Sequence, residues 1–225
     1  MSPAFLAGPG DARLVTAPLL QLGWTSPASA CGVQLESPCR AAFLARSCGG
    51  GWELSVRAKT TARSSWSATF GARAPAEIIA AATTPAAAAL AGHSALHSCG
   101  SGAPRRILDL ADIATASGHG WRSPSGHAVL EIDNDPASAA RWVVTVKSAA
   151  PERGGWRAVF SHGSPFYVLD AVTEAITSHT PVARNVRELP GKHLTDLSTP
   201  TAGGGPLPRC RAPHPRPARP TVRKR

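Results

Sequence analysis

The sequence predicts an α+β protein of two tandem repeats, each with a short helix, an antiparallel β-meander of three to four strands and a packing helix. Three observations predict this fold. Tryptophans recur at a regular spacing, apolar residues alternate around them, and the apolar period then lengthens to that of a helix. The chain has 225 residues, of which 43% are hydrophobic, and this is enough apolar material for a core.

The internal repeat is defined by the six tryptophans. They form three pairs, Trp52 with Trp142, Trp66 with Trp156, and Trp24 with Trp121. The first two pairs share an offset of 90 residues, and the third has an offset of 97. Around the second pair, WSATFGARAPAEIIAAAT (66–83) aligns with WRAVFSHGSPFYVLDAVT (156–173). Agreement at this many positions indicates a duplication.

Alternating residues predict the strands and their register. Side chains two apart in a strand share a face, so Trp52, Leu54 and Val56 should point the same way. A polar, turn-rich segment then leads to a second run in the same phase, which predicts an antiparallel hairpin centred near residue 61. This register places Trp52 opposite Phe70 and Val56 opposite Trp66, and the equivalent register in the second copy places Trp142 opposite Phe160.

The phase of the aromatic residues favours a structural core over an exposed stacking surface, because each shares its strand face with Leu, Val or Phe. The residues assigned to this core are Trp24, Trp52, Trp66, Phe70, Trp121, Trp142, Trp156 and Phe160. An exposed row of tryptophans that binds a partner is the alternative interpretation.

Helices are expected on both sides of each meander. Pro75 and Pro165 stand where a helix begins, with Ser164 as an N-cap, and apolar spacing predicts a helix over 165–178. In the first copy, Pro85 should end or kink the helix near Thr84. Short helical segments are also expected just before the first strands, over 19–24 and 113–121.

These elements divide the chain into four parts. We expect repeat 1 over 6–91, a small-residue linker over 92–104, repeat 2 over 105–185 and a Pro/Arg-rich tail over 186–225, disordered at least from 201. A unit of about 80 residues is marginal alone, so the two repeats should pack together through their sheets or helices.

The net charge of +10 is concentrated at the C-terminus. Residues 201–225 contain seven basic residues and no acidic one: Arg209, Arg211, Arg216, Arg219, Arg223, Lys224 and Arg225. Such a segment can neutralise phosphates without reading base sequence, so these residues are the candidate nucleic-acid contacts.

Several classes of function receive no support from the sequence. We expect no membrane partner, because the chain lacks a run of about 18 apolar residues. We also expect no secretory signal, because residues 1–13 lack a charged segment followed by a sustained apolar stretch. The five cysteines fit neither a disulfide framework nor a zinc module, and reduced thiols predict a cytoplasmic protein. The linker contains His93, His97 and Cys99, which we do not expect to bind a metal there. The alternating acidic residues at 131, 133 and 135 are interpreted as a solvated hairpin end. No metal, cofactor or catalytic residue is therefore predicted.

Three phrases carry a resemblance to a known family: LAGPGDARLVTAPLLQLGW (6–24), SWSATFGARAPAEIIAA (65–81) and WRAVFSHGSPFYVLDAVTEAI (156–176). They resemble the family called domain of unknown function 317, which is common in Streptomyces and often occurs as two copies. The resemblance covers roughly 6–185 and implies no activity or site residue. The family usually has Ser-Pro-Asp-Gly in the meander turn, where this chain has Ser-Pro-Cys-Arg and Ser-Pro-Ser-Gly.

Three functions remain open from the sequence. The first is a non-catalytic interaction module that binds an unknown protein partner through the sheet or helices. The second is non-specific nucleic-acid association through the basic tail. The third is an enzyme whose catalytic residues follow no known motif.

Overall fold

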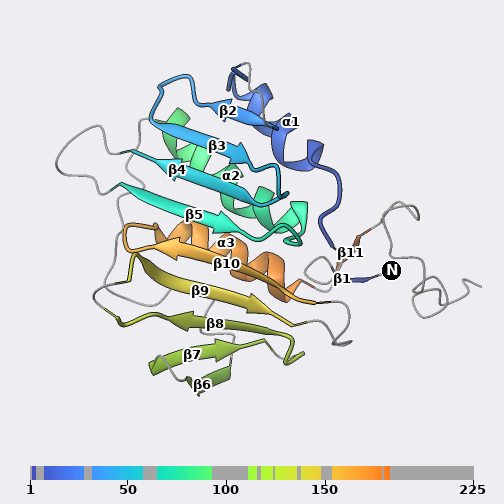
Figure 1. Ribbon diagram of the computed structural model, residues 1–225, viewed down its shortest axis with the longest axis vertical. Helices are drawn as coiled ribbons and strands as arrows, with labels where there is room; N and C mark the ends of the chain where they lie inside the picture. The colour runs from blue at the N-terminus through green and yellow to red at the C-terminus, as the bar shows by residue number, and fades with distance from the viewer. Residues whose placement is uncertain are drawn as a thin grey trace, which may run out of the picture.

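The computed structural model describes residues 2–3, 8–27, 32–57, 65–92, 111–115, 118–123, 125–135, 138–147, 154–178 and 180–182. Within these residues, nine strands form one antiparallel sheet, and helices lie against one of its faces (Figure 1). A separate pair of short strands joins β1 (Ser2–Pro3) to β11 (Pro181–Val182). The expected α+β class and the two tandem repeats are confirmed.

The two repeats contribute their elements in nearly the same order. Repeat 1 forms α1 (Arg13–Gln21), β2 (Gln34–Glu36), β3 (Ala42–Arg46), β4 (Trp52–Val56), β5 (Trp66–Phe70) and α2 (Ala76–Ala91). Repeat 2 forms β6 (Ala111–Thr115), β7 (Gly118–Arg122), β8 (Ala128–Ile132), β9 (Ala140–Val146), β10 (Trp156–Ser161) and α3 (Phe166–Thr177).

The predicted hairpin register is confirmed in both copies. Trp52 pairs with Phe70 and Val56 with Trp66 in the β4–β5 hairpin. The β9–β10 hairpin repeats this pairing, with Trp142 opposite Phe160. Because the apolar residues on these strands stay in phase, one face of the two hairpins is apolar.

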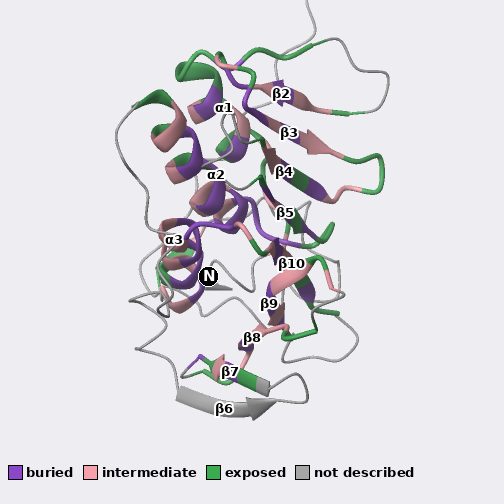
Figure 2. Ribbon diagram, turned by 90° about the vertical axis from the view of Figure 1, so that its left-hand side faces the viewer, coloured by how far each residue is buried: buried purple, intermediate pink, exposed green. Residues whose placement is uncertain are grey.

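The core fills the space between this inner face and the helices (Figure 2). Seven of the eight aromatic residues assigned to the core are buried: Trp24, Trp52, Trp66, Phe70, Trp142, Trp156 and Phe160. The eighth, Trp121, is half-buried and stacks on Trp142 with the ring centroids 6.0 Å apart. The tryptophans of both repeats therefore belong to one continuous core.

The repeats meet where β5 pairs with β10, in the sheet order β2-β3-β4-β5-β10-β9-β8-β7-β6. Thr69 lies directly opposite Val159, and these two positions are 90 residues apart. They are therefore equivalent in the two copies, and a pseudo-two-fold axis passes between them. Helices α2 and α3 pack against each other on the inner side of the same junction. We call β5, β10, α2 and α3 together the seam, and it confirms that the repeats form one assembly.

Two expectations about helices are wrong, and a third is wrong in part. Residues 113–115 and 118–121 belong to the β6–β7 hairpin instead of a helix. Of the end or kink expected at Pro85, the end is wrong, since α2 continues to Ala91. Ser164 does not cap α3, because its hydroxyl donates across the seam to the Ser67 carbonyl at 3.4 Å.

The pairing of Trp24 with Trp121 also needs correction. Leu35 pairs with Leu44 in repeat 1, and Trp121 pairs with Leu130 in repeat 2. Leu44 and Leu130 are equivalent, because they pair in turn with residues 54 and 144. Trp121 therefore occupies the place of Leu35, and the unequal spacing of this third tryptophan pair is explained.

Each meander turns at a Ser-Pro sequence held by a buried serine. The hydroxyl of Ser37 accepts the N–H of Ala42 at 2.9 Å, and that of Ser123 accepts the N–H of Ala128 at 3.1 Å. Three residues after each serine the backbone turns left-handed, with φ of 53° at Arg40 and 74° at Gly126. The Ser-Pro element is thus a structural turn in both repeats.

Candidate interaction surface

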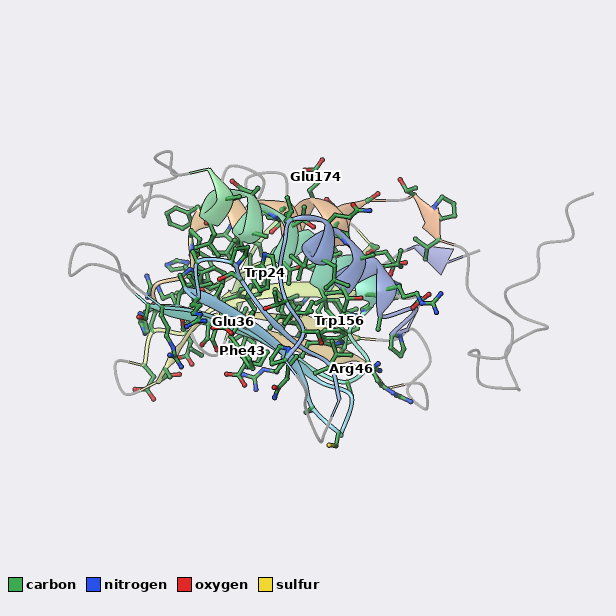
Figure 3. All side chains as sticks on the ribbon, turned by 90° about the horizontal axis from the view of Figure 1, so that it is seen from above. Trp24, Glu36, Phe43, Arg46, Trp156 and Glu174 are labelled. Atoms are coloured by element: carbon green, nitrogen blue, oxygen red, sulfur yellow. The ribbon has the colours of Figure 1, made fainter. Side chains whose placement is uncertain are left out.

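No described helix covers the face of the sheet turned away from the core, and we call it the outer face (Figure 2). Its residues alternate with the core positions along β2–β5 and β8–β10. They are Gln34, Glu36, Phe43, Ala45, Glu53, Ser55, Ser67, Thr69, Val129, Glu131, Arg141, Val143, Thr145, Arg157 and Val159. In Figure 3, Phe43 lies on this side, whereas Glu174 projects from the helix side.

The two halves of the outer face differ in charge although their backbones are equivalent. Repeat 1 presents Glu36 and Glu53, and the position equivalent to Glu36 in repeat 2 is Arg122. Ser67 of repeat 1 is likewise matched by Arg157 of repeat 2. At the inner positions of the hairpins, in contrast, both copies keep apolar residues. The duplication has therefore preserved the core and diversified the outer face.

A small apolar cluster lies near the centre of the outer face. Val143 is 5% exposed although no described helix packs on that side. It pairs with Val159 on β10 and with Glu131 on β8. Val159 in turn lies opposite Thr69, so this cluster reaches the seam. Both repeats consequently contribute to the middle of the surface.

Asp133 lies in the turn that joins β8 to β9, beside the basic half. Its carboxylate accepts the backbone N–H of Asp135 at 3.0 Å. This bond lowers the pKa of Asp133 below its ordinary value, helped by a hydrogen bond from Ser138 and by the charges of Arg157 and His162. The carboxylate of Asp133 therefore stabilises its own turn through these hydrogen bonds.

The structure does not place every residue that the sequence singled out. The basic residues from Arg209 to Arg225, and the histidines and cysteine of the expected linker, lie outside the described residues. Among the residues that are described, no group of His, Cys, Asp or Glu side chains could hold a metal ion. No helix in the described ranges is long and apolar enough to cross a membrane.

Sequence reasoning did not identify the outer-face residues as a surface. The signal was present in part, because the residues that alternate with a tryptophan strand must face the other side. No pattern in the sequence predicts that β5 pairs with β10, because the residues of an edge strand do not indicate which strand it pairs with.

Comparison with known proteins gives one finding. The family model described as SPDY, domain of unknown function (DUF317), matches residues 25–91 and 122–182, which together make up more than half of the chain. The first match begins at the residue that bridges to β2 and ends with α2, and the second runs from the end of β7 to β11. No curated protein and no solved structure matches the chain.

Proposed function

The chain belongs to the family of SPDY domains of unknown function (DUF317), and we propose that it is a non-catalytic interaction module that binds a protein partner through the outer face. The proposal rests on one observation. The outer-face residues differ in charge between the two repeats, whereas the equivalent core residues stay apolar. This divergence gives the two halves of the outer face different charges, and such a pattern can discriminate between partner surfaces.

The mixture of charges favours a protein over a nucleic acid on this face. Glu36, Glu53 and Glu131 share it with Arg141 and Arg157. A phosphate backbone is bound by a surface of predominantly positive sign, and the glutamates would repel it. Protein interfaces commonly combine an apolar centre with a charged rim, as the Val143 cluster and its neighbours do.

The test uses two exposed threonines on opposite sides of the molecule. Thr69 lies at the centre of the outer face, and Thr84 lies on the solvent side of α2. Thr69→Arg should abolish capture of a protein partner from a nuclease-treated lysate, whereas Thr84→Arg should retain it. Direct titration of the purified partner against both variants then gives the affinities. Equal retention by both variants would exclude the outer face as the binding surface.

We propose nucleic-acid association through residues 201–225 as a second function, because these residues carry seven basic groups and no acid. Binding to random DNA should be weak, and log affinity should fall with log salt at a slope of about −5 to −6 if every basic group contacts a phosphate. Removal of 201–225 should abolish binding and leave the unfolding temperature unchanged. No gel shift at low salt would remove this function.

The remaining expectations stand as proposals. We propose the boundaries given above for the repeats, the linker and the tail. We also propose a cytoplasmic location, supported by Cys48, whose side chain is exposed in the β3–β4 turn. An exposed thiol persists in a reducing compartment and is oxidised in a secretory one.

A further inference from the structure

We infer that the seam is a complete two-fold interface through which two copies of this chain can associate by exchanging repeats. In the exchanged form, repeat 1 of one chain pairs with repeat 2 of the other. The partner is thus a second copy of this chain, and the association buries the strand edges and helix sides of the seam, not the outer-facing side chains that are proposed above to bind a protein partner.

The strand register is the first argument. Ala68 pairs with Phe160, and Phe70 pairs with Ala158, on either side of the Thr69–Val159 pair. A two-fold rotation that superposes repeat 1 on repeat 2 also superposes the first of these residue pairs on the second. This is the isologous geometry of a two-fold homodimer, in which the same patch is used twice. Here the two patches belong to one chain.

Each repeat contributes equivalent buried side chains to the interface. Phe70 and Phe160 meet edge to face, with centroids 5.7 Å apart and an interplanar angle of 87°. Both are at most 2% exposed, and Ala68 and Ala158 are fully buried. Cutting either phenylalanine to alanine should therefore remove a contact that only the other repeat supplies.

Polar bonds close both ends of the strand pair. At one end, the N–H of Gly71 donates to the Arg157 carbonyl at 2.8 Å. At the other end, the N–H of Ser67 donates to the hydroxyl of Ser161 at 2.8 Å. The hydroxyl of Ser164 adds its bond to the Ser67 carbonyl. The backbone groups at this junction are thus satisfied by the opposite repeat and not by solvent.

The helices complete the seam above the strands. Phe166, at the start of α3, contacts Trp142 of β9 on the side away from repeat 1. Val168 and Val172 lie about 200° and 240° further around the helix, and α3 packs against α2. Their equivalents in α2 are Ile78 and Ala82, and all four side chains are buried. Each repeat therefore offers an apolar strand edge together with an apolar helix side.

The strand edge and the helix side of each repeat must be covered by a complementary surface. Separated repeats would expose unpaired strand edges and the buried phenylalanines, and such edges pair readily with another chain. Within one chain, the connection between the repeats gives an effective concentration of the order of millimolar, which favours the closed monomer. Refolding at high protein concentration reduces this advantage and allows pairing between chains.

The experiment uses two full-length chains, one with Thr69→Cys and the other with Val159→Cys. All five native cysteines are replaced by serine. The two intact chains are mixed at high concentration, passed together through mild urea and refolded. Opposed Cβ atoms in a sheet are about 4.5–5.5 Å apart, so a disulfide between residues 69 and 159 should link two intact chains into a covalent dimer.

The matched control uses Ser55→Cys and Thr145→Cys, which are equivalent outer-face positions separated by β5 and β10. This pair should give no linked product. A second readout, native mass spectrometry of isotope-labelled and unlabelled intact chains, should detect mixed dimers without any engineered cysteine. The inference is overturned if the refolded chains are monomers only, or if dimers form without the disulfide between residues 69 and 159.

Discussion

Single residues explain why both meanders turn at the same place. Ser37 and Ser123 are 2% and 5% exposed, and each hydroxyl accepts a backbone N–H that the turn would otherwise leave unpaired. The third turn residue supports the serine in both copies, since Cys39 Sγ lies 3.6 Å and Ser125 Oγ lies 3.0 Å from the serine hydroxyl. Neither copy needs an aspartate at this position to form the turn.

Ser37→Ala should therefore destabilise the protein by about 1–3 kcal/mol, because it leaves the buried N–H of Ala42 without an acceptor. Urea denaturation measures the change. Ser55→Ala is the control, since the Ser55 hydroxyl bonds an exposed carboxylate of Glu53, and it should cost less than about 0.5 kcal/mol. Equal costs for the two variants would mean that the turn does not depend on the buried serine.

Asp133 predicts a pH dependence whose sign follows from its environment. The backbone N–H of Asp135 and the neighbouring hydroxyl stabilise the charged form and lower the pKa of Asp133 from its ordinary value of 3.8. The stability it contributes is therefore complete above pH 5 and is lost as the pH falls through its folded pKa.

An NMR titration of the Asp133 carboxyl should give a pKa below 3.8, and Ser138→Ala should move it back toward that value. The difference in unfolding temperature between the native chain and Asp133→Asn should disappear at acid pH. A midpoint at or above the ordinary value in the native chain would contradict the hydrogen bonding of this turn.

At the scale of elements, α2 differs from α3 by carrying a proline in its interior. Pro85 lacks the N–H that would bond the Ala81 carbonyl, and α2 nevertheless runs from Ala76 to Ala91. Its equivalent in α3 is Ala175. Tertiary packing against α1 and α3 therefore outweighs the local cost of the proline.

Pro85→Ala should stabilise the protein by about 1–3 kcal/mol, because it restores a helical hydrogen bond and removes the ring from the preceding turn. Pro75→Ala is the matched control at the N-cap of the same helix, where the ring fits the backbone and its removal should give no stabilisation. Denaturant melts of the two variants compare them directly. An unchanged or lowered stability in Pro85→Ala would show that the core is built around the ring.

The elements also show which inferences the sequence could support. The hairpins were predictable because Trp52 and Trp66 fix the phase of two neighbouring strands, and a slip of one residue would expose both. The β6–β7 hairpin was missed because its second strand contains Gly118 and Gly120, and because the segment ends in Gly-Trp as the expected helix of the first copy does. The sequence predicts which residues lie on the outer face. It does not predict that they form one surface, because the two halves are joined only where β5 pairs with β10.

The whole molecule should unfold as a single unit, because the seam runs through the middle of the sheet and of the core. Phe160→Ala in repeat 2 should cost about 3–5 kcal/mol and loosen repeat 1 equally. Hydrogen exchange of β4 and β5 measures this effect on repeat 1. Leu130→Ala, a core change on β8 away from the seam, is the control for general destabilisation. Two separate thermal transitions, or normal protection in β4 and β5 after Phe160→Ala, would show independent repeats.

The pairing of β1 with β11 closes the described chain almost into a ring. Ser2 lies opposite Val182, so the first and last described segments are neighbours beside the molecule's midpoint (Figure 1). Val182 is followed by 43 further residues, so a short peptide could join these segments only after that stretch is removed, with new ends opened between α2 and β6. The resulting circular permutant would read repeat 2 before repeat 1 and keep the same sheet. Folding of this permutant would show that the order of the two copies along the gene does not determine this architecture.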